Sequence, residues 1–295
     1  MIVDSAQPVW RMQVVNYNIG FYMGARFDQH FLKDVSAVKR ICDQVDPECR
    51  SLLEIGPGQG VLTHELLSRG FRVHAIERDP LLISPLENRF AAEIASGQFV
   101  LTHGDALTIS FDMIPFEYVV SNLPYSISSP ITFRLLEYPF SGAVLMYQRE
   151  FADRMRAGVG SRESGRLTIM VQTFAYVTHC FDLSRNAFTP PPAVGSTVLK
   201  LQPKDPIFYI ASQEVYATVV RELFSKRRKM VRTILAAAIP VFGEEKITSA
   251  LSELDSEILE SRPEQLYLED YATIANLVTP RGGAKTPTPN VRGSK

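Results

Sequence analysis

The glycine-rich loop at residues 54–60, Glu-Ile-Gly-Pro-Gly-Gln-Gly, constrains the fold of this chain more than any other segment. The short apolar run at 51–55 precedes it and reads as a strand, and residues 60–70 follow it as a helix closed by a glycine. Gly56, Gly58 and Gly60 let the backbone approach a ligand closely, with amide groups free to donate hydrogen bonds. A strand, a tight loop and a helix in this order predict the start of a parallel α/β sheet.

Strand-like and helical segments continue to alternate after this loop. A helix is predicted before it at 31–46, and afterwards strands at 71–79, 98–107, 117–125, 142–148 and 196–202, with helices at 80–91, 129–138 and 149–157. Residues 167–183 are rich in β-branched and aromatic side chains. This alternation favours a Rossmann-like α/β fold with a parallel sheet covered on both faces.

After about residue 204 the alternation of predicted strands and helices stops. Residues 214–239, 244–254 and 268–278 have helical periodicity without strand candidates between them, which predicts a small all-helical C-terminal domain. The predicted organisation is therefore an N-terminal extension at 1–23, a catalytic domain at 24–204, a helical domain at 205–279 and a disordered tail at 280–295.

Composition excludes several classes of protein. The net charge is −1, and the three cysteines lack the paired spacing of a disulfide framework or a metal site. The histidines form no ligand motif, so no metal is expected. The sequence has no long apolar run and no signal peptide. These features predict a protein that has no membrane segment and is located in the cytoplasm or, in a nucleated cell, in the nucleolus.

Polar side chains stand at the ends of four successive predicted strands, where parallel sheets bind cofactors: Glu54, Glu77, Asp105 and Asn122. Glu77 can accept hydrogen bonds from both ribose hydroxyls, which S-adenosylmethionine and NAD share, and Asp105 can accept one from an adenine amino group. The G-x-G-x-G spacing, with Glu54 two residues before it, favours S-adenosylmethionine over NAD, and the lack of G-K-[ST] argues against a P-loop. The alternative is that Glu77 and Asp105 only cap helices.

The segment Asn122-Leu123-Pro124-Tyr125 predicts the acceptor site. The amino group of a nucleobase is a poor nucleophile, because its lone pair is delocalised into the ring. The Asn122 side-chain oxygen and a main-chain carbonyl of the Leu123-Pro124 turn can accept its N–H groups, while Tyr125 offers a face for the base to stack on. The alternative is a simple Asn-x-Pro turn with a core tyrosine.

Basic residues crowd a stretch that is predicted to be helical. Arg221, Arg228 and Arg232 fall near one helical face, and phosphate contact is their functional interpretation. The alternative is a solvated helix face. The whole cluster consists of Arg221, Lys226, Arg227, Arg228, Lys229 and Arg232. A second patch near the cleft is suggested by Arg149, Arg154 and Arg156.

Together these motifs resemble the small-subunit ribosomal RNA adenine N6,N6-dimethyltransferases, over about residues 24–280. The segments that carry the resemblance are Arg26–Leu32 (RFDQHFL), EIGPGQGVLT (54–63), AIERD (75–79), GDAL (104–107), NLPYSISSPI (122–131), FTPPPAVGSTVLKL (188–201), LFSKRRKMVRTIL (223–235) and RPEQLYLEDYATIANLV (262–278).

This resemblance implies dimethylation of two adjacent adenosines near the 3′ end of small-subunit rRNA in a pre-ribosomal 30S/40S-type particle, with S-adenosylmethionine as the methyl donor. The enzyme is expected to be a monomer. Phe188 is expected to stack on the second face of the base. The residues expected to bind the cofactor are Gln29, His30, Leu32, Glu54, Gly56, Gly58, Gly60, Glu77, Arg78, Asp105, Ala106 and Asn122. Asp28, His30 and Ser126 depart from the residues usual in the family.

Three other functions compete with this one. Large-subunit rRNA adenine methyltransferases of the macrolide-resistance type share the loop and an Asn-x-Pro-Tyr-like motif. A non-catalytic RNA-binding assembly factor can keep the fold, although intact Glu77, Asp105, Asn122 and Tyr125 argue against lost catalysis. A DNA adenine methyltransferase is a further alternative, but the sequence lacks a recognisable DNA-reading module.

Overall fold

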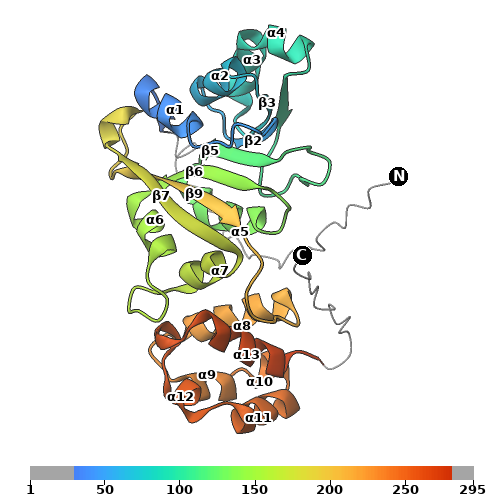
Figure 1. Cartoon of the computed structure of the whole chain (residues 1–295), viewed down its shortest axis with the longest axis vertical. Coiled ribbons are helices and arrows are strands. Elements are labelled where there is room, and N and C mark those ends of the chain that lie inside the picture. The colour runs from blue at the N-terminus through green and yellow to red at the C-terminus, as the bar shows by residue number, and fades with distance from the viewer. Residues whose placement is uncertain (1–29, 281–295) are drawn as a thin grey trace, which may run out of the picture. The chain divides into compact units, whose positions relative to one another are not determined.

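The structure, a computed structural model, describes residues 30–280 of the chain (Figure 1). Within them the chain forms two compact units. The first contains residues 30–158 and 163–205, and the second contains residues 159–162 and 206–280. The predicted N-terminal extension and, apart from Pro280, the predicted tail lie outside the described residues.

A seven-stranded sheet forms the centre of the first unit, in the order β4-β3-β2-β5-β6-β9-β7. The first five of these strands run parallel to their neighbours, which confirms the predicted parallel sheet. At the other edge β9 is antiparallel to β6, and β7 is antiparallel to β9. The chain between β7 and β9 contains no α-helix that could carry it back across the sheet, so these two strands pair antiparallel. The strands are β2 (Ser51–Ile55), β3 (Arg72–Glu77), β4 (Phe99–His103), β5 (Tyr118–Asn122), β6 (Gly142–Gln148), β7 (Ala175–Leu183) and β9 (Ser196–Pro203).

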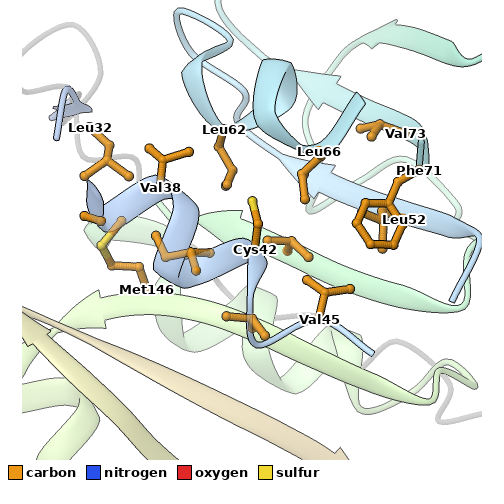
Figure 2. Packing of buried hydrophobic residues seen from close by; sticks show 14 of the residues in the cluster. Leu32, Val38, Cys42, Val45, Leu52, Leu62, Leu66, Phe71, Val73 and Met146 are labelled. Atoms are coloured by element: carbon orange, nitrogen blue, oxygen red, sulfur yellow. The ribbon is translucent and has the colours of Figure 1, made fainter. Parts of the chain in front are cut away.

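Helices cover both faces of this sheet. Alternate side chains of β5 face opposite ways, so Val120 packs with one set of helices and Val119 with the other. Figure 2 shows the first of these cores, where Val38 and Cys42 meet Leu62. On this face lie α1 (Val35–Cys42), α2 (Val61–Ser68) and α3 (Pro80–Arg89), which is followed by the short α4 (Ala91–Ala95). On the other face lie α5 (Ser128–Leu135), α6 (Arg149–Arg156) and α7 (Arg166–Phe174).

The predicted helix at 31–46 starts later than expected. Residues Phe31–Leu32 form β1, which pairs antiparallel with β8 (Phe188–Thr189). Asp34 then begins α1, because its carboxylate accepts the main-chain N–H groups of Ser36 and Ala37 at 2.9 and 3.1 Å. The early apolar residues therefore belong to a strand pair rather than to the helix.

Helices are the only regular secondary structure of the second unit within residues 206–280, which confirms the predicted all-helical C-terminal region. Its fully buried side chains include Tyr216, Leu223, Val231, Tyr271 and Ile274. Its α-helices are α8 (Gln213–Ser225), α9 (Val231–Ala236), α10 (Ile239–Phe242), α11 (Glu244–Glu253), α12 (Ser256–Glu260) and α13 (Leu268–Val278), and it has one short 3-10 helix, η3 (Pro263–Gln265). The first unit contains two further short 3-10 helices, η1 (Tyr125–Ile127) and η2 (Arg185–Ala187). Among the helices of residues 30–280, none is long and apolar enough to cross a membrane.

Candidate active site

A pocket opens at the carboxyl ends of β2, β3 and β5, where the sequence predicted the cofactor and acceptor sites. It brings together the glycine loop, Glu54, Glu77 and the segment beginning at Asn122. Residues of β1 also line it. The lining residues are His30, Phe31, Leu32, Glu54, Gly56, Pro57, Gly58, Gln59, Val61, Leu62, Glu77, Asn122, Leu123, Pro124 and Tyr125.

The glycine loop has a backbone conformation that other residues rarely adopt. Gly58 and Gly60 have φ angles of 59° and 74°, in the left-handed region. A Cβ at Gly58 would lie 3.0 Å from the ring of Phe31, and one at Gly60 would lie 2.6 Å from the ring of Phe90. The loop therefore needs glycine at these positions both for its turn and for its close neighbours.

Glu77 fixes the loop from the end of β3. One carboxylate oxygen accepts the main-chain N–H of Gly58 at 3.1 Å, and the other accepts that of Asp79 at 2.8 Å. The side chain is only 5% exposed, yet it lines the pocket. Each oxygen of a carboxylate can accept more than one hydrogen bond, so Glu77 keeps acceptor capacity toward the pocket.

Glu54 lies beneath the same pocket and is almost completely buried. The hydroxyl of Thr63 donates to its carboxyl at 2.7 Å. Burial raises the pKa of Glu54 to about 8, the Thr63 hydrogen bond opposes this shift, and the charge of Glu77 adds to it. Glu54 is therefore mainly protonated at neutral pH.

Gly60, Arg78, Asp105 and Ala106 are not among the residues of 30–280 that line this pocket. The carboxylate of Asp105 accepts the N–H of Leu107 at 2.9 Å and lies 3.4 Å from the Arg78 guanidinium. The Asp105 carboxylate thus stabilises its own turn, and no helix begins at this residue. Roles for Gly60, Arg78, Asp105 and Ala106 in cofactor binding stay predictions, and Gln29 lies outside the described residues.

Asn122 ends β5 with its side-chain amide held in one orientation. The Asn122 amide nitrogen donates to the main-chain carbonyl of His30 at 3.0 Å. The nitrogen is therefore committed to protein, and the side-chain oxygen is left as the group that can accept from a ligand. This is the orientation that an acceptor of amino N–H groups requires.

Of the two aromatic residues predicted to contact the base, only Tyr125 lines the pocket in the described structure. Tyr125 lines the pocket, its hydroxyl lies 2.7 Å from the hydroxyl of Ser196, and its ring centroid lies 5.7 Å from that of His30. Phe188 is fully buried beside β1 and does not line the pocket among the described residues. A stacking role for Phe188 stays a prediction, and it would need this side chain to become accessible.

Comparison with known proteins decides between the families that share such a pocket. A family model described as ribosomal RNA adenine dimethylase matches residues 21–276 of this chain. The chain belongs to the ribosomal RNA adenine dimethylase family. It is similar to a probable ribosomal RNA small subunit methyltransferase A from Methanospirillum hungatei, with 55% identity over 86% of this chain and 98% of that protein. A protein of the same description from Halobacterium salinarum is 39% identical, over 85% of this chain and 88% of its own length.

Solved structures of two methyl-transferring enzymes resemble the chain across most of its length. A dimethyladenosine transferase from Plasmodium falciparum has a TM-score of 0.69 and 29% identity, covering 83% of this chain and 96% of its own. The 23S rRNA methyltransferase ErmE has a TM-score of 0.60 and 26% identity, covering 84% of this chain and 99% of its own. Membership of the dimethylase family thus fits the fold of both units and the pocket.

The basic cluster of this family member does not lie on one helical face, so that prediction was wrong. Helix α8 ends at Ser225 and α9 begins at Val231. The four consecutive cations at 226–229 lie in the turn between them, where mutual repulsion disfavours a helix. The N–H of Val231 donates to the carbonyl of Ser261 at 2.9 Å instead of continuing a helical ladder.

Some residues of the basic cluster form ion pairs with neighbouring carboxylates and others do not. Arg221 pairs with Glu222 at 3.3 Å, and Arg232 pairs with Glu260 at 2.8 Å. Arg227 lies 3.6 Å from Glu264 and donates to the main-chain carbonyl of Arg162. The other three members are exposed and form no ion pair within residues 30–280: Lys226, Arg228 and Lys229.

Sequence reasoning missed three contacts of the pocket. Thr63 donates to Glu54, the His30 carbonyl orients Asn122, and Ser196 contacts Tyr125. A main-chain carbonyl carries no sequence signal, and one buried serine in a strand resembles any other.

Proposed function

We propose that this chain transfers methyl groups from S-adenosylmethionine to the N6 amino groups of two adjacent adenosines near the 3′ end of small-subunit rRNA. The substrate is the rRNA within a pre-ribosomal 30S/40S-type particle, and the enzyme acts as a cytoplasmic monomer. Residues 24–204 form its catalytic domain and residues 205–279 its RNA-binding domain. The single observation that carries this proposal is the Asn122 amide, which is oriented with its oxygen as the free acceptor beside the glycine loop.

The pocket fits S-adenosylmethionine by two features. The left-handed glycines leave the loop without side chains where a ligand would approach, and Glu77 places carboxylate oxygens at the end of β3. We assign Gly56, Gly58 and Glu77 to hold the nucleoside part of the cofactor, with His30 and Leu32 closing over it. When bound, this cofactor supplies an electrophilic methyl group attached to a positively charged sulfur.

The residues of the chain orient the acceptor and strengthen its nucleophilicity. The Asn122 oxygen and the Leu123 carbonyl accept the N–H groups of adenine, which returns electron density to the nitrogen. Tyr125 supports the face of the base. The amino group loses its proton after methylation, when it is acidic enough for water to accept it, so positioning and electrostatics provide most of the catalysis.

The exposed turn between α8 and α9 supplies charge for RNA. We propose that Lys226, Arg228 and Lys229 contact phosphates, because their charges are not neutralised by neighbouring carboxylates in the described structure. Arg221, Arg227 and Arg232 are assigned mainly to the stability of the helical unit.

A transfer assay tests the substrate. Purified full-length protein is mixed with labelled S-adenosylmethionine and with small or large ribosomal subunits that lack the methyl marks. Label on two adjacent adenosines of the small subunit supports the proposal. Label confined to the large subunit would favour the activity of the ErmE-like relatives, and binding without transfer would favour an assembly factor.

Asn122→Ala tests the site itself. Removing an acceptor that strengthens in the transition state should lower kcat by about 100-fold. RNA affinity should fall much less, because the basic turn is intact. Asn122→Asp is the matched variant, since it keeps the oxygen but loses the donor to the His30 carbonyl. Unchanged turnover in Asn122→Ala would exclude the assigned role.

A further inference from the structure

The hydroxyl of Tyr125 forms a hydrogen bond with Ser196, a residue of the central sheet. Tyr125 belongs to the three-residue turn η1, whereas its partner Ser196 is the first residue of β9 and is fully buried. Ser196 pairs with Gln148 of β6 on one side and with Leu183 of β7 on the other. The Tyr125 ring, which extends from a short turn, is thus hydrogen-bonded at its hydroxyl end to Ser196, whose position is fixed by pairing with two strands.

Three features of the described structure support the position of this ring. Pro124 fixes the backbone entering η1, with a φ of −55°. The ring of His30 lies 5.7 Å away at 38°. The Ser196 hydroxyl, 2.7 Å from the tyrosine oxygen, holds the far end of the ring and so the direction of its long axis. The hydroxyl pair therefore limits how far the ring, on which a base would stack, can swing about its attachment to the backbone.

We propose that Ser196 is a positioning residue for the acceptor base, acting through Tyr125 without touching the base itself. This rests on the proposed function, in which an adenine stacks on Tyr125. Stacking energy depends on the alignment of the two planes, and the reacting nitrogen must also stay in line with the methyl donor. A ring released at its far end therefore binds the base almost as well but holds it less often in the reactive alignment.

The chain contains a matched control for the loss of such a hydroxyl pair. The Tyr147 hydroxyl lies 2.8 Å from the hydroxyl of Thr132, and both side chains are fully buried in the core of the same unit. Neither residue lines the pocket. Tyr147→Phe removes the same kind of hydrogen bond from the same fold, away from the proposed acceptor site.

A double-mutant cycle tests the proposal by kinetics. Ser196→Ala and Tyr125→Phe should each lower kcat about 3- to 10-fold, the range expected for one hydrogen bond, with KM changed less than twofold. The double variant should be no slower than either single variant, since both remove one interaction. Tyr147→Phe should leave kcat within twofold even if it lowers Tm. A Ser196→Ala variant as fast as the wild type, or losses that multiply in the double variant, would overturn the proposal.

A spectroscopic measurement decides the contact independently of turnover. With tyrosine labelled by ¹³C at Cζ, the Tyr125 resonance is identified by its loss in Tyr125→Phe. Ser196→Ala should shift and broaden it, whereas Tyr147→Phe should leave it in place. An unmoved resonance in Ser196→Ala rules out the positioning role. If the wild type transfers no methyl group but this resonance responds, the proposed function has failed while the Tyr125–Ser196 contact stands.

Discussion

Replacing Glu54 by glutamine removes a buried carboxyl with almost no change in size. Burial raises the pKa of this group from its ordinary 4.5 to about 8, so the folded chain keeps a proton that the unfolded chain has lost. Between these two pH values the folded state binds more protons than the unfolded state, and the free energy of unfolding falls as pH rises. Glu54→Gln has no proton to lose and escapes this dependence.

The size of the effect follows from the two pKa values. Each pH unit between them costs the wild type about 1.4 kcal/mol. Close to the folded pKa this pH dependence becomes weaker. The free energy of unfolding of Glu54→Gln, relative to that of the wild type, should therefore increase by about 2 kcal/mol from pH 6 to pH 8. The Thr63 hydroxyl keeps an acceptor in the variant, since a glutamine oxygen replaces the carboxyl oxygen.

Urea unfolding at pH 6, 7 and 8, followed by circular dichroism, measures this difference. Glu117→Gln is the control. The carboxylate of Glu117 accepts the N–H groups of Arg50 and Ser51, which lower its pKa, so its contribution to stability is lost only as pH falls below this window. Its difference from the wild type should stay constant from pH 6 to 8. Parallel curves for the wild type and Glu54→Gln would refute a protonated Glu54.

Two further comparisons test the loop and the basic turn. Gly60→Ala and Gly70→Ala both place a side chain in the left-handed region, at about 1 kcal/mol each, but only the first meets another group, the Phe90 ring at 2.6 Å. Gly60→Ala should therefore lose at least 1 kcal/mol more in urea unfolding, and equal losses would contradict the contact. In RNA binding measured against salt, Arg228→Ala should reduce the slope of log affinity by about 0.7, whereas Arg232→Ala should leave it unchanged. Equal slopes for the two variants would show that ion pairing with Glu260 does not decide which arginines bind RNA.

The sequence allowed the sheet and its carboxyl edge to be predicted because both depend on local patterns. Apolar runs ending in Glu54, Glu77 and Asn122 mark strand ends, and the fold then brings those ends together. The second unit was predictable for the same reason, since helical periodicity is local. The antiparallel pairing of β7 and β9 was not, because it depends on which edge of the sheet is left after the other strands have paired.

The errors lie where long-range contacts override a local preference. Residues 214–239 are predicted as one helical stretch, but the N–H of Val231 donates to the carbonyl of Ser261 and the helix ends before it. Phe31 and Leu32 extend an apolar helical pattern, yet they pair with Phe188 and Thr189, which are more than 150 positions away. Burial of Phe188 follows from that pairing and could not be predicted from its own neighbours in sequence.

The short strand β1 and the residue before it contact both the glycine loop and Asn122, so a movement of this strand would affect both parts of the pocket. Phe31 covers Gly58 of the loop, and the carbonyl of the preceding residue, His30, holds the Asn122 amide. On the proposed function, any movement of β1 that uncovers the loop to exchange a spent cofactor also releases the Asn122 amide that holds the acceptor. Two methyl transfers to one nitrogen would then require the acceptor site to be assembled twice. We therefore expect distributive kinetics, with monomethylated adenine accumulating before the dimethylated product.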